Sequence, residues 1–92
     1  MKAIWNGTVV AESDDTVVFD GEHYFPADAV KRQFLLSSNT RTMSSRGQAS
    51  YYTLFVDGDA HPDAAWTYAD PKEAAVALKG RIAFGKGVSV VE

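Results

Sequence analysis

The residues best suited to chemistry lie in a polar stretch near the middle of the chain, Thr40 to Gly47. Arg41 and Arg46 stand there among serine and threonine side chains. A guanidinium group donates paired hydrogen bonds that match the oxygens of a carboxylate or phosphate, and hydroxyl groups can add further bonds. The stretch therefore indicates a site for a small polar or anionic molecule. The alternative is a solvated turn whose hydroxyls bond to their own backbone.

Aromatic side chains with polar tips could form the walls of such a site. Tyrosine and tryptophan combine an apolar ring with one hydrogen-bonding group, which suits the lining of a pocket. We expect the polar stretch to fold back over an aromatic hollow. The predicted ligand-binding residues are Tyr24, Thr42, Arg46, Gly47, Tyr52 and Trp66.

Metal and cofactor sites find little support in the sequence. His61 stands between Asp59 and Asp63, but the chain has two histidines and no cysteine, whereas catalytic zinc commonly takes three protein ligands. The glycines of Gly85-Lys86-Gly87 lack the spacing of a phosphate-binding loop. We therefore predict neither a metal nor a cofactor.

An enzymatic role stays open, with no catalytic residue assigned. His23 could act as a general base, although a strand position beside Tyr24 and Phe25 is also typical of a packed or surface histidine. A nucleophile at Ser44 or Ser45 lacks the Gly-x-Ser-x-Gly elbow. A transferase or hydrolase reaction would have to proceed without a thiol, because cysteine is absent.

Length and charge limit the classes of partner. A chain of 92 residues suits one domain, 1–92, with one core. Its net charge of −3 provides no positive field for a phosphate backbone, so we expect no nucleic-acid partner. Apolar runs fall far short of the roughly 20 residues that span a bilayer. Without a membrane segment or a secretory pattern at its start, the chain is expected to be cytoplasmic.

Strands joined by tight turns are predicted in the first part of the chain, and they must help to position the site. Asn6-Gly7 predicts a two-residue hairpin between strands over Lys2 to Trp5 and Thr8 to Glu12. Strands over Thr16 to Phe19 and His23 to Phe25 would continue it as a meander of four strands.

The second half carries the longest predicted strand. Gln48 to Val56 has apolar or aromatic residues on both faces, which is typical of a central strand. Asp57-Gly58 predicts a second hairpin turn, and the returning strand from Asp59 to Tyr68 is weakened at His61-Pro62. We interpret the residues before it, Ser37 to Gln48, as the longest loop.

Two helices and a last hairpin complete the prediction. Pro26 precedes a helix over Ala27 to Phe34, and Asp70 caps a second helix over Pro71 to Lys79. Strands over Arg81 to Phe84 and Val88 to Val91 would pair with each other. The fold class is mainly β, or α+β by content: an antiparallel β-tent-like barrel or two-sheet domain with two short helices.

Several short motifs together resemble the domain of unknown function 427 family, which also has a nucleotidyltransferase-like name. The resemblance covers almost the whole chain and includes the opening hairpin, Pro71, Lys79-Gly80 and Ala83-Phe84. The remaining motifs are Tyr24-Phe25-Pro26 with Val30, Gly47-x-Ala49-x-Tyr51-Tyr52 and Ala65-Trp66-x-Tyr68.

The resemblance implies a β-tent fold, similar in shape to B-type methionine sulfoxide reductases, with two antiparallel sheets meeting along one edge. The family pattern Thr-x-Cys-Pro-Trp/Tyr-Lys-Gly is replaced here by Thr42-Met43-Ser44-Ser45-Arg46-Gly47. Because Met43 offers a thioether where a typical member offers a thiol, no thiol-dependent activity carries over. Kinship of fold does not establish kinship of function.

The sequence thus favours a small-ligand-binding module with an aromatic and arginine-lined pocket. One alternative is a protein-interaction scaffold, such as a homodimer, since tyrosine-rich surfaces suit partners as well. The other alternative is a cysteine-independent enzyme.

Overall fold

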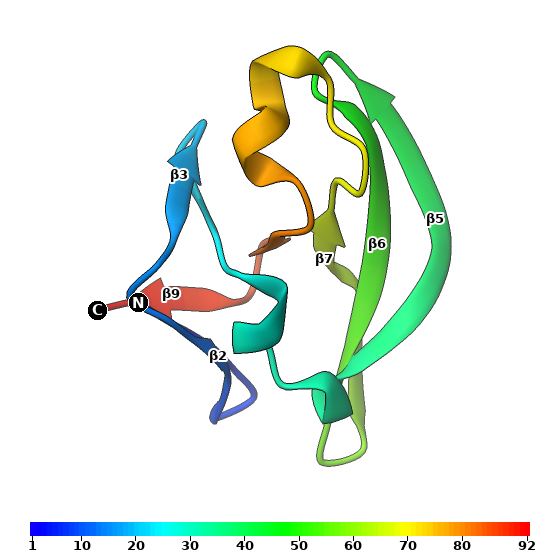
Figure 1. The fold of residues 1–92 in the computed structure, drawn as a ribbon. Helices are drawn as coiled ribbons and strands as arrows, with labels where there is room; N and C mark the ends of the chain where they lie inside the picture. The colour runs from blue at the N-terminus through cyan, green and yellow to red at the C-terminus, as the bar shows by residue number, and fades with distance from the viewer.

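Nine strands in three antiparallel sheets make up most of the chain, and the computed structural model describes residues 1–92 (Figure 1). The strands are β1 (Lys2–Trp5), β2 (Thr8–Glu12), β3 (Val17–Phe19), β4 (Glu22–Tyr24), β5 (Leu35–Ser44), β6 (Gly47–Val56), β7 (Asp59–Thr67), β8 (Ile82–Phe84) and β9 (Ser89–Val91). The sheets have the orders β2-β1-β9, β3-β4 and β5-β6-β7-β8. The prediction of a mainly β, antiparallel fold is confirmed, and no sheet closes into a barrel.

The predicted hairpin turns at Asn6-Gly7 and Asp57-Gly58 are confirmed. The φ angles are 53° and 73° in the first turn and 51° and 83° in the second. Two successive positive φ angles match the twist of paired strands, and asparagine, aspartate and glycine adopt them at low cost. Both turns therefore form where local chemistry alone places them.

The two predicted helices are wrong. Short 3₁₀ segments replace them: η1 (Ala27–Ala29), η2 (Arg32–Phe34) and η3 (Glu73–Leu78). Between η1 and η2 the chain is extended, because Val30 bridges Ala11 and the backbone amide of Lys31 donates to the Val10 carbonyl at 2.8 Å. In η3, a non-helical φ of −123° at Ala75 interrupts the turns. None of these segments has the length or the apolar run needed to cross a membrane.

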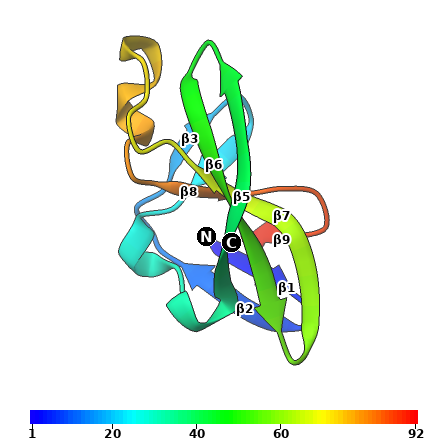
Figure 2. The same ribbon diagram turned by 90° about the vertical axis from the view of Figure 1, so that its right-hand side faces the viewer.

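The predicted loop over Ser37 to Gln48 is also wrong, because most of it is the edge strand β5. β5 pairs with β6 from Leu35↔Leu54 to Ser44↔Gly47. Most of its side chains are exposed, so no apolar alternation marks it in the sequence. Figure 2 shows the resulting long hairpin, with η3 beside its end.

The predicted terminal hairpin does not form, since its two strands join different sheets. β8 pairs with β7 (Trp66↔Ala83), and β9 pairs with β1 (Ala3↔Val90). The predicted meander is likewise divided, because β1–β2 and β3–β4 are hairpins in separate sheets. Local turn signals do not specify such long-range partners.

The third sheet separates two hydrophobic clusters. Successive residues of a strand point to opposite faces, so Phe84 packs in the larger cluster with Phe25 and Leu54, whereas Ala83 packs in the smaller one. The β2-β1-β9 sheet contributes to the larger cluster. The smaller cluster contains Tyr24, Ala49, Tyr68, Ala75, Leu78 and Ala83.

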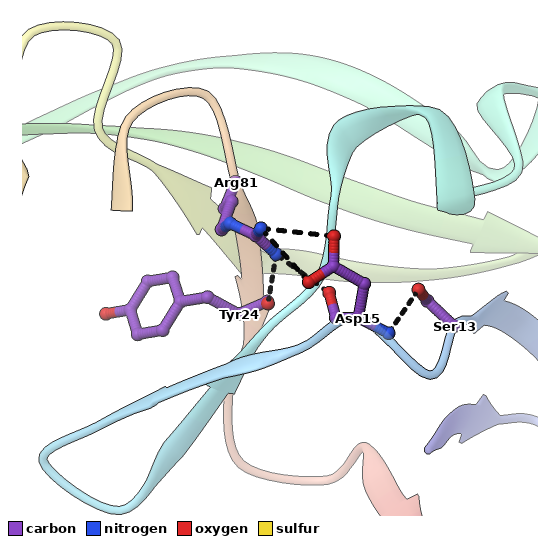
Figure 3. Close-up of polar contacts among 4 residues, drawn as sticks. All are labelled: Ser13, Asp15, Tyr24 and Arg81. Carbon is purple, nitrogen blue, oxygen red and sulfur yellow. Dashed lines mark hydrogen bonds and ion pairs between the residues drawn. The ribbon is translucent and has the colours of Figure 1, made fainter. Parts of the chain in front are cut away.

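One corner joins the β3–β4 hairpin to this sheet. Phe25 and Ile82 exchange two backbone hydrogen bonds, of 2.8 and 2.9 Å. Arg81 strengthens the corner: its guanidinium donates to the Asp15 carbonyl at 2.8 Å, to the Tyr24 carbonyl at 3.4 Å and to the Asp15 carboxylate (Figure 3). The base of the hairpin is therefore firmly anchored.

Two irregularities bend the third sheet at the level of Asp63. The register of β5 shifts between Ser37 and Arg41, and that of β6 against β7 shifts between Tyr52 and Leu54. The Asp63 carboxylate accepts hydrogen bonds from the hydroxyls of Ser38 (2.5 Å) and Thr40 (2.7 Å). One aspartate thus joins the two irregular segments across β6, and the predicted weakness near His61-Pro62 coincides with the second.

Replacing Asp63 tests this connection through pH. The two hydroxyl donors hold the pKa of Asp63 below its ordinary value of 3.8. The stabilisation is present above that value and is lost as the pH falls through the folded pKa. We expect Asp63→Asn to lower the melting temperature at neutral pH, and the difference from the parent protein to shrink as the pH is lowered below 3.8.

The Asp63→Asn variant would retain the left-handed backbone at this position, where φ is 54°, because asparagine tolerates it. Asp57→Asn is the matched control, since Asp57 has a similar φ of 51° in an exposed turn. A difference in melting temperature that stays constant with pH would contradict the role of the carboxylate.

Candidate functional site

Arg46 occupies the turn between β5 and β6, and its side chain reaches the tip of the β3–β4 hairpin. The guanidinium forms an ion pair with Asp20, and its Cζ lies 5.1 Å from the centre of the Phe19 ring. The Arg46 side chain is 28% exposed, whereas that of Asp20 is 65% exposed. The guanidinium therefore lies between the tips of the β3–β4 and β5–β6 hairpins, and the Asp20 carboxylate lies on its solvent-exposed side.

The surroundings of Arg46 keep it charged. The hydroxyl of Tyr68 and then the carboxylate of Asp20, both acceptors for the guanidinium, raise the pKa of Arg46 above its ordinary value, while burial acts weakly in the opposite direction. Arg46 is thus a permanent cation at all accessible pH values.

Below Arg46 lies a pair of polar aromatic side chains. The indole Nε1 of Trp66 donates to the hydroxyl of Tyr24 at 3.2 Å, and Tyr24 is fully buried. Burial raises the pKa of Tyr24, and the indole donor opposes this only in part. Tyr24 consequently remains an uncharged phenol within the electrostatic reach of Arg46.

Two further tyrosines, which were not predicted as site residues, belong to the same face. The Tyr51 ring lies 6.2 Å from that of Trp66, and its hydroxyl is 3.1 Å from the Thr42 hydroxyl. Tyr68 lies two residues beyond Trp66 and packs in the same smaller cluster. Strand alternation was the available signal, since residues two apart share a face.

The structure therefore brings together four of the predicted residues and separates one. Tyr24, Trp66, Arg46 and Thr42 all lie on the face of the smaller cluster. Tyr52 points the other way along β6 and packs against the larger cluster. Adjacent residues of one strand cannot share a face, so Tyr51, not Tyr52, stands beside Trp66.

The sixth predicted residue, Gly47, forms the other side of the hairpin end. A Cβ there would lie 3.3 Å from backbone atoms of Asp70, Pro71 and Lys72, and φ is +120°. The Lys72 amide donates to the Arg46 carbonyl at 2.7 Å. This close approach fixes the backbone from which the Arg46 side chain projects.

A shallow groove of about 380 Å³ lies on the opposite face of the hairpin end from Trp66. Its lining consists of Met43, Gly47, Gln48, Ser50, Ala69, Asp70 and Lys72. Gly47 is the one predicted site residue that borders it. The aromatic side chains of the smaller cluster do not open onto this groove.

The residues considered for a metal site have separate partners. His61 Nε2 lies 2.7 Å from the Lys86 carbonyl oxygen, and Asp59 accepts a hydrogen bond from the Asn6 amide. Asp63 bonds instead to hydroxyls of β5. No group of three or more histidine, cysteine or acidic side chains is placed to hold a metal ion.

The groups considered for acid–base or nucleophilic chemistry take part in local contacts. His23 Nδ1 lies 3.4 Å from the Thr16 hydroxyl on the neighbouring segment. The Ser44 hydroxyl accepts a hydrogen bond from the Arg46 backbone amide at 3.2 Å. The chemical groups gathered around Arg46 are therefore a cation, aromatic rings and phenols.

Gly47→Ala should destabilise the protein more than the same change at an open turn. The added methyl group meets backbone at 3.3 Å in a strained conformation, which typically costs about 1–3 kcal/mol. Gly58→Ala is the control, because φ is +83° there and nothing lies within 4 Å. Urea unfolding of both variants measures the difference, and equal losses would show that close packing at Gly47 contributes nothing.

Tyr24→Phe tests the phenol–indole bond. Loss of one hydrogen bond should cost about 1 kcal/mol and shift the Trp66 indole resonance in a ¹H–¹⁵N spectrum, with Trp5 as the internal reference. Tyr52→Phe, on the opposite face, should leave the Trp66 resonance in place. An unchanged Trp66 resonance in Tyr24→Phe would argue against the bond.

Comparison with known proteins identifies one family over nearly the whole chain. The family model described as "Domain of unknown function (DUF427)" matches residues 1–91, which is nearly the whole chain. No curated protein matches the sequence of this chain. The match includes every strand of the fold and the hairpin end that carries Arg46, and the chain therefore belongs to the DUF427 family.

Proposed function

We propose that the chain is a small-ligand-binding module that holds an anionic group at Arg46, beside the polar aromatic side chains of the smaller cluster. The observation that carries the proposal is the position of the guanidinium. It contacts the Phe19 ring and the Tyr68 hydroxyl, yet its counter-charge is Asp20, whose side chain is 65% exposed.

The ion pair with Asp20 is weak enough for a ligand to replace. Exposed ion pairs contribute about 0.2–1 kcal/mol, because water and salt screen them. A ligand carboxylate or phosphate could use the same donors in a bidentate arrangement. The ion pair with Asp20 therefore holds the Arg46 guanidinium in place and can still give way to a ligand.

The aromatic residues supply shape beside this charge. Trp66 and Tyr51 are both partly exposed at the edge of the smaller cluster, and their rings offer flat apolar surface with polar groups nearby. Binding sites commonly combine such surface with a few fixed polar groups.

An interaction surface is the second candidate, favoured by apolar side chains on the outside of the third sheet. Leu36 is 50% exposed and Phe55 is 41% exposed. Leu36 pairs with Thr53, which lies two residues before Phe55, so the two side chains share one face. A second copy of the chain could cover them, and analytical sedimentation of the purified protein at increasing concentration would reveal it.

A thermal-shift screen with nucleotides, sugar phosphates and carboxylates tests the binding proposal. A ligand at 100 times its Kd should add about 2.7 kcal/mol of stability. Arg46→Gln should abolish the shift, whereas Arg32→Gln, an equal change of charge at an exposed position of η2, should retain it.

The binding proposal fails if no compound raises the melting temperature of the parent protein. It fails equally if a shift survives Arg46→Gln unchanged, because the ligand would then bind elsewhere.

A further inference from the structure

We propose that the ligand held at Arg46 is a small aromatic carboxylate, and that Phe19 and Asp20 occupy its place when no ligand is bound. This inference rests on the proposed function, because it names the ligand class of the same site.

The basis is a combination of groups that the chain itself supplies. Phe19 and Asp20 are consecutive at the tip of the β3–β4 hairpin, and both contact one guanidinium: the ring at 5.1 Å from Cζ, and the carboxylate through an ion pair. A ring and a carboxylate on one arginine are the two recognition elements of an aromatic acid. The hairpin tip therefore shows which chemistry the site accepts.

The tip is built so that it can move while its base stays in place. β3 and β4 have three residues each and form a two-stranded sheet of their own, and such a hairpin has little stability by itself. Its base is held by Arg81, which bonds to Asp15 and to the Tyr24 carbonyl (Figure 3). The Asp20-Gly21 turn at the far end has the ion pair to Arg46 as its one side-chain bond to β5–β6.

The local charge favours a monoanion over a phosphate dianion. Arg46 is the cation whose charge lowers the pKa of Tyr24, while Glu22 adds a negative charge in the same region. The other arginine that contacts this hairpin, Arg81, is already bonded to Asp15 at the base. One guanidinium matches one carboxylate, whereas a phosphate dianion carries a second negative charge beside Glu22.

The experiment compares phenylacetate, acetate and inorganic phosphate at constant ionic strength. Binding is followed in ¹H–¹⁵N spectra through the Trp66 indole and the amides of Phe19, Asp20 and Gly21. Asp20→Asn removes the internal carboxylate and keeps a residue that tolerates the φ of 51°. Asp57→Asn is the matched control, with the same net charge, the same φ of 51° and a following glycine in the β6–β7 turn.

We expect phenylacetate to bind more tightly than acetate or phosphate, and to shift the amides of the β3–β4 tip in the parent protein. In Asp20→Asn its Kd should fall by about threefold, the effect of removing one exposed ion pair as a competitor. Asp57→Asn should bind as the parent does.

The alternative outcomes separate this inference from the proposed function. Tighter binding of phosphate than of phenylacetate at Arg46 would overturn the ligand class and leave the function standing. Equal affinity in Asp20→Asn and the parent would overturn the occupancy of the site by the hairpin tip. If no anion of the thermal-shift screen binds and none of the three probes binds to any variant, the proposed function itself fails.

Discussion

The reciprocal backbone bonds between Phe25 and Ile82 are the constraint on which the rest of the structure depends. They attach β4 to β8 at a fixed register, so that Phe25 enters the larger cluster while Tyr24 enters the smaller one. A slip of one residue would exchange these side chains between faces. Because the register holds, the β3–β4 hairpin stands over the smaller cluster, and its tip meets Arg46.

The parts of the fold that follow from the sequence are those specified by neighbouring residues. Asn6-Gly7 and Asp57-Gly58 have side chains and backbone freedom suited to tight hairpin turns, and both turns form. The β5 edge strand could not be recognised, because exposed residues on an edge need no apolar pattern. Ala27 to Phe34 has helical spacing, but pairing of Val30 with Ala11 keeps its centre extended. The partners of β8 and β9 depend on contacts across the whole chain, which no turn signal carries.

The candidate site shows the same division. Arg46, Tyr24 and Trp66 could be chosen by residue type alone, and they come to lie on one face. To choose between Tyr51 and Tyr52, one must know which face of β6 lies beside Trp66, and this depends on the pairing of β6 with β7. Phe19 and Asp20 could not be found, because their contact with Arg46 joins two hairpins that are far apart in the sequence.

The pairing of β1 with β9 has a consequence for how the protein is made. β1 has β2 on one side and β9 on the other (Figure 2), so β1 leaves the ribosome long before its second neighbour exists. Contacts between such distant segments are slow to form, because the intervening chain must be ordered first. The β1–β2 hairpin therefore waits with one open edge until β9 has been synthesised, and closing that edge is a naturally late step of folding.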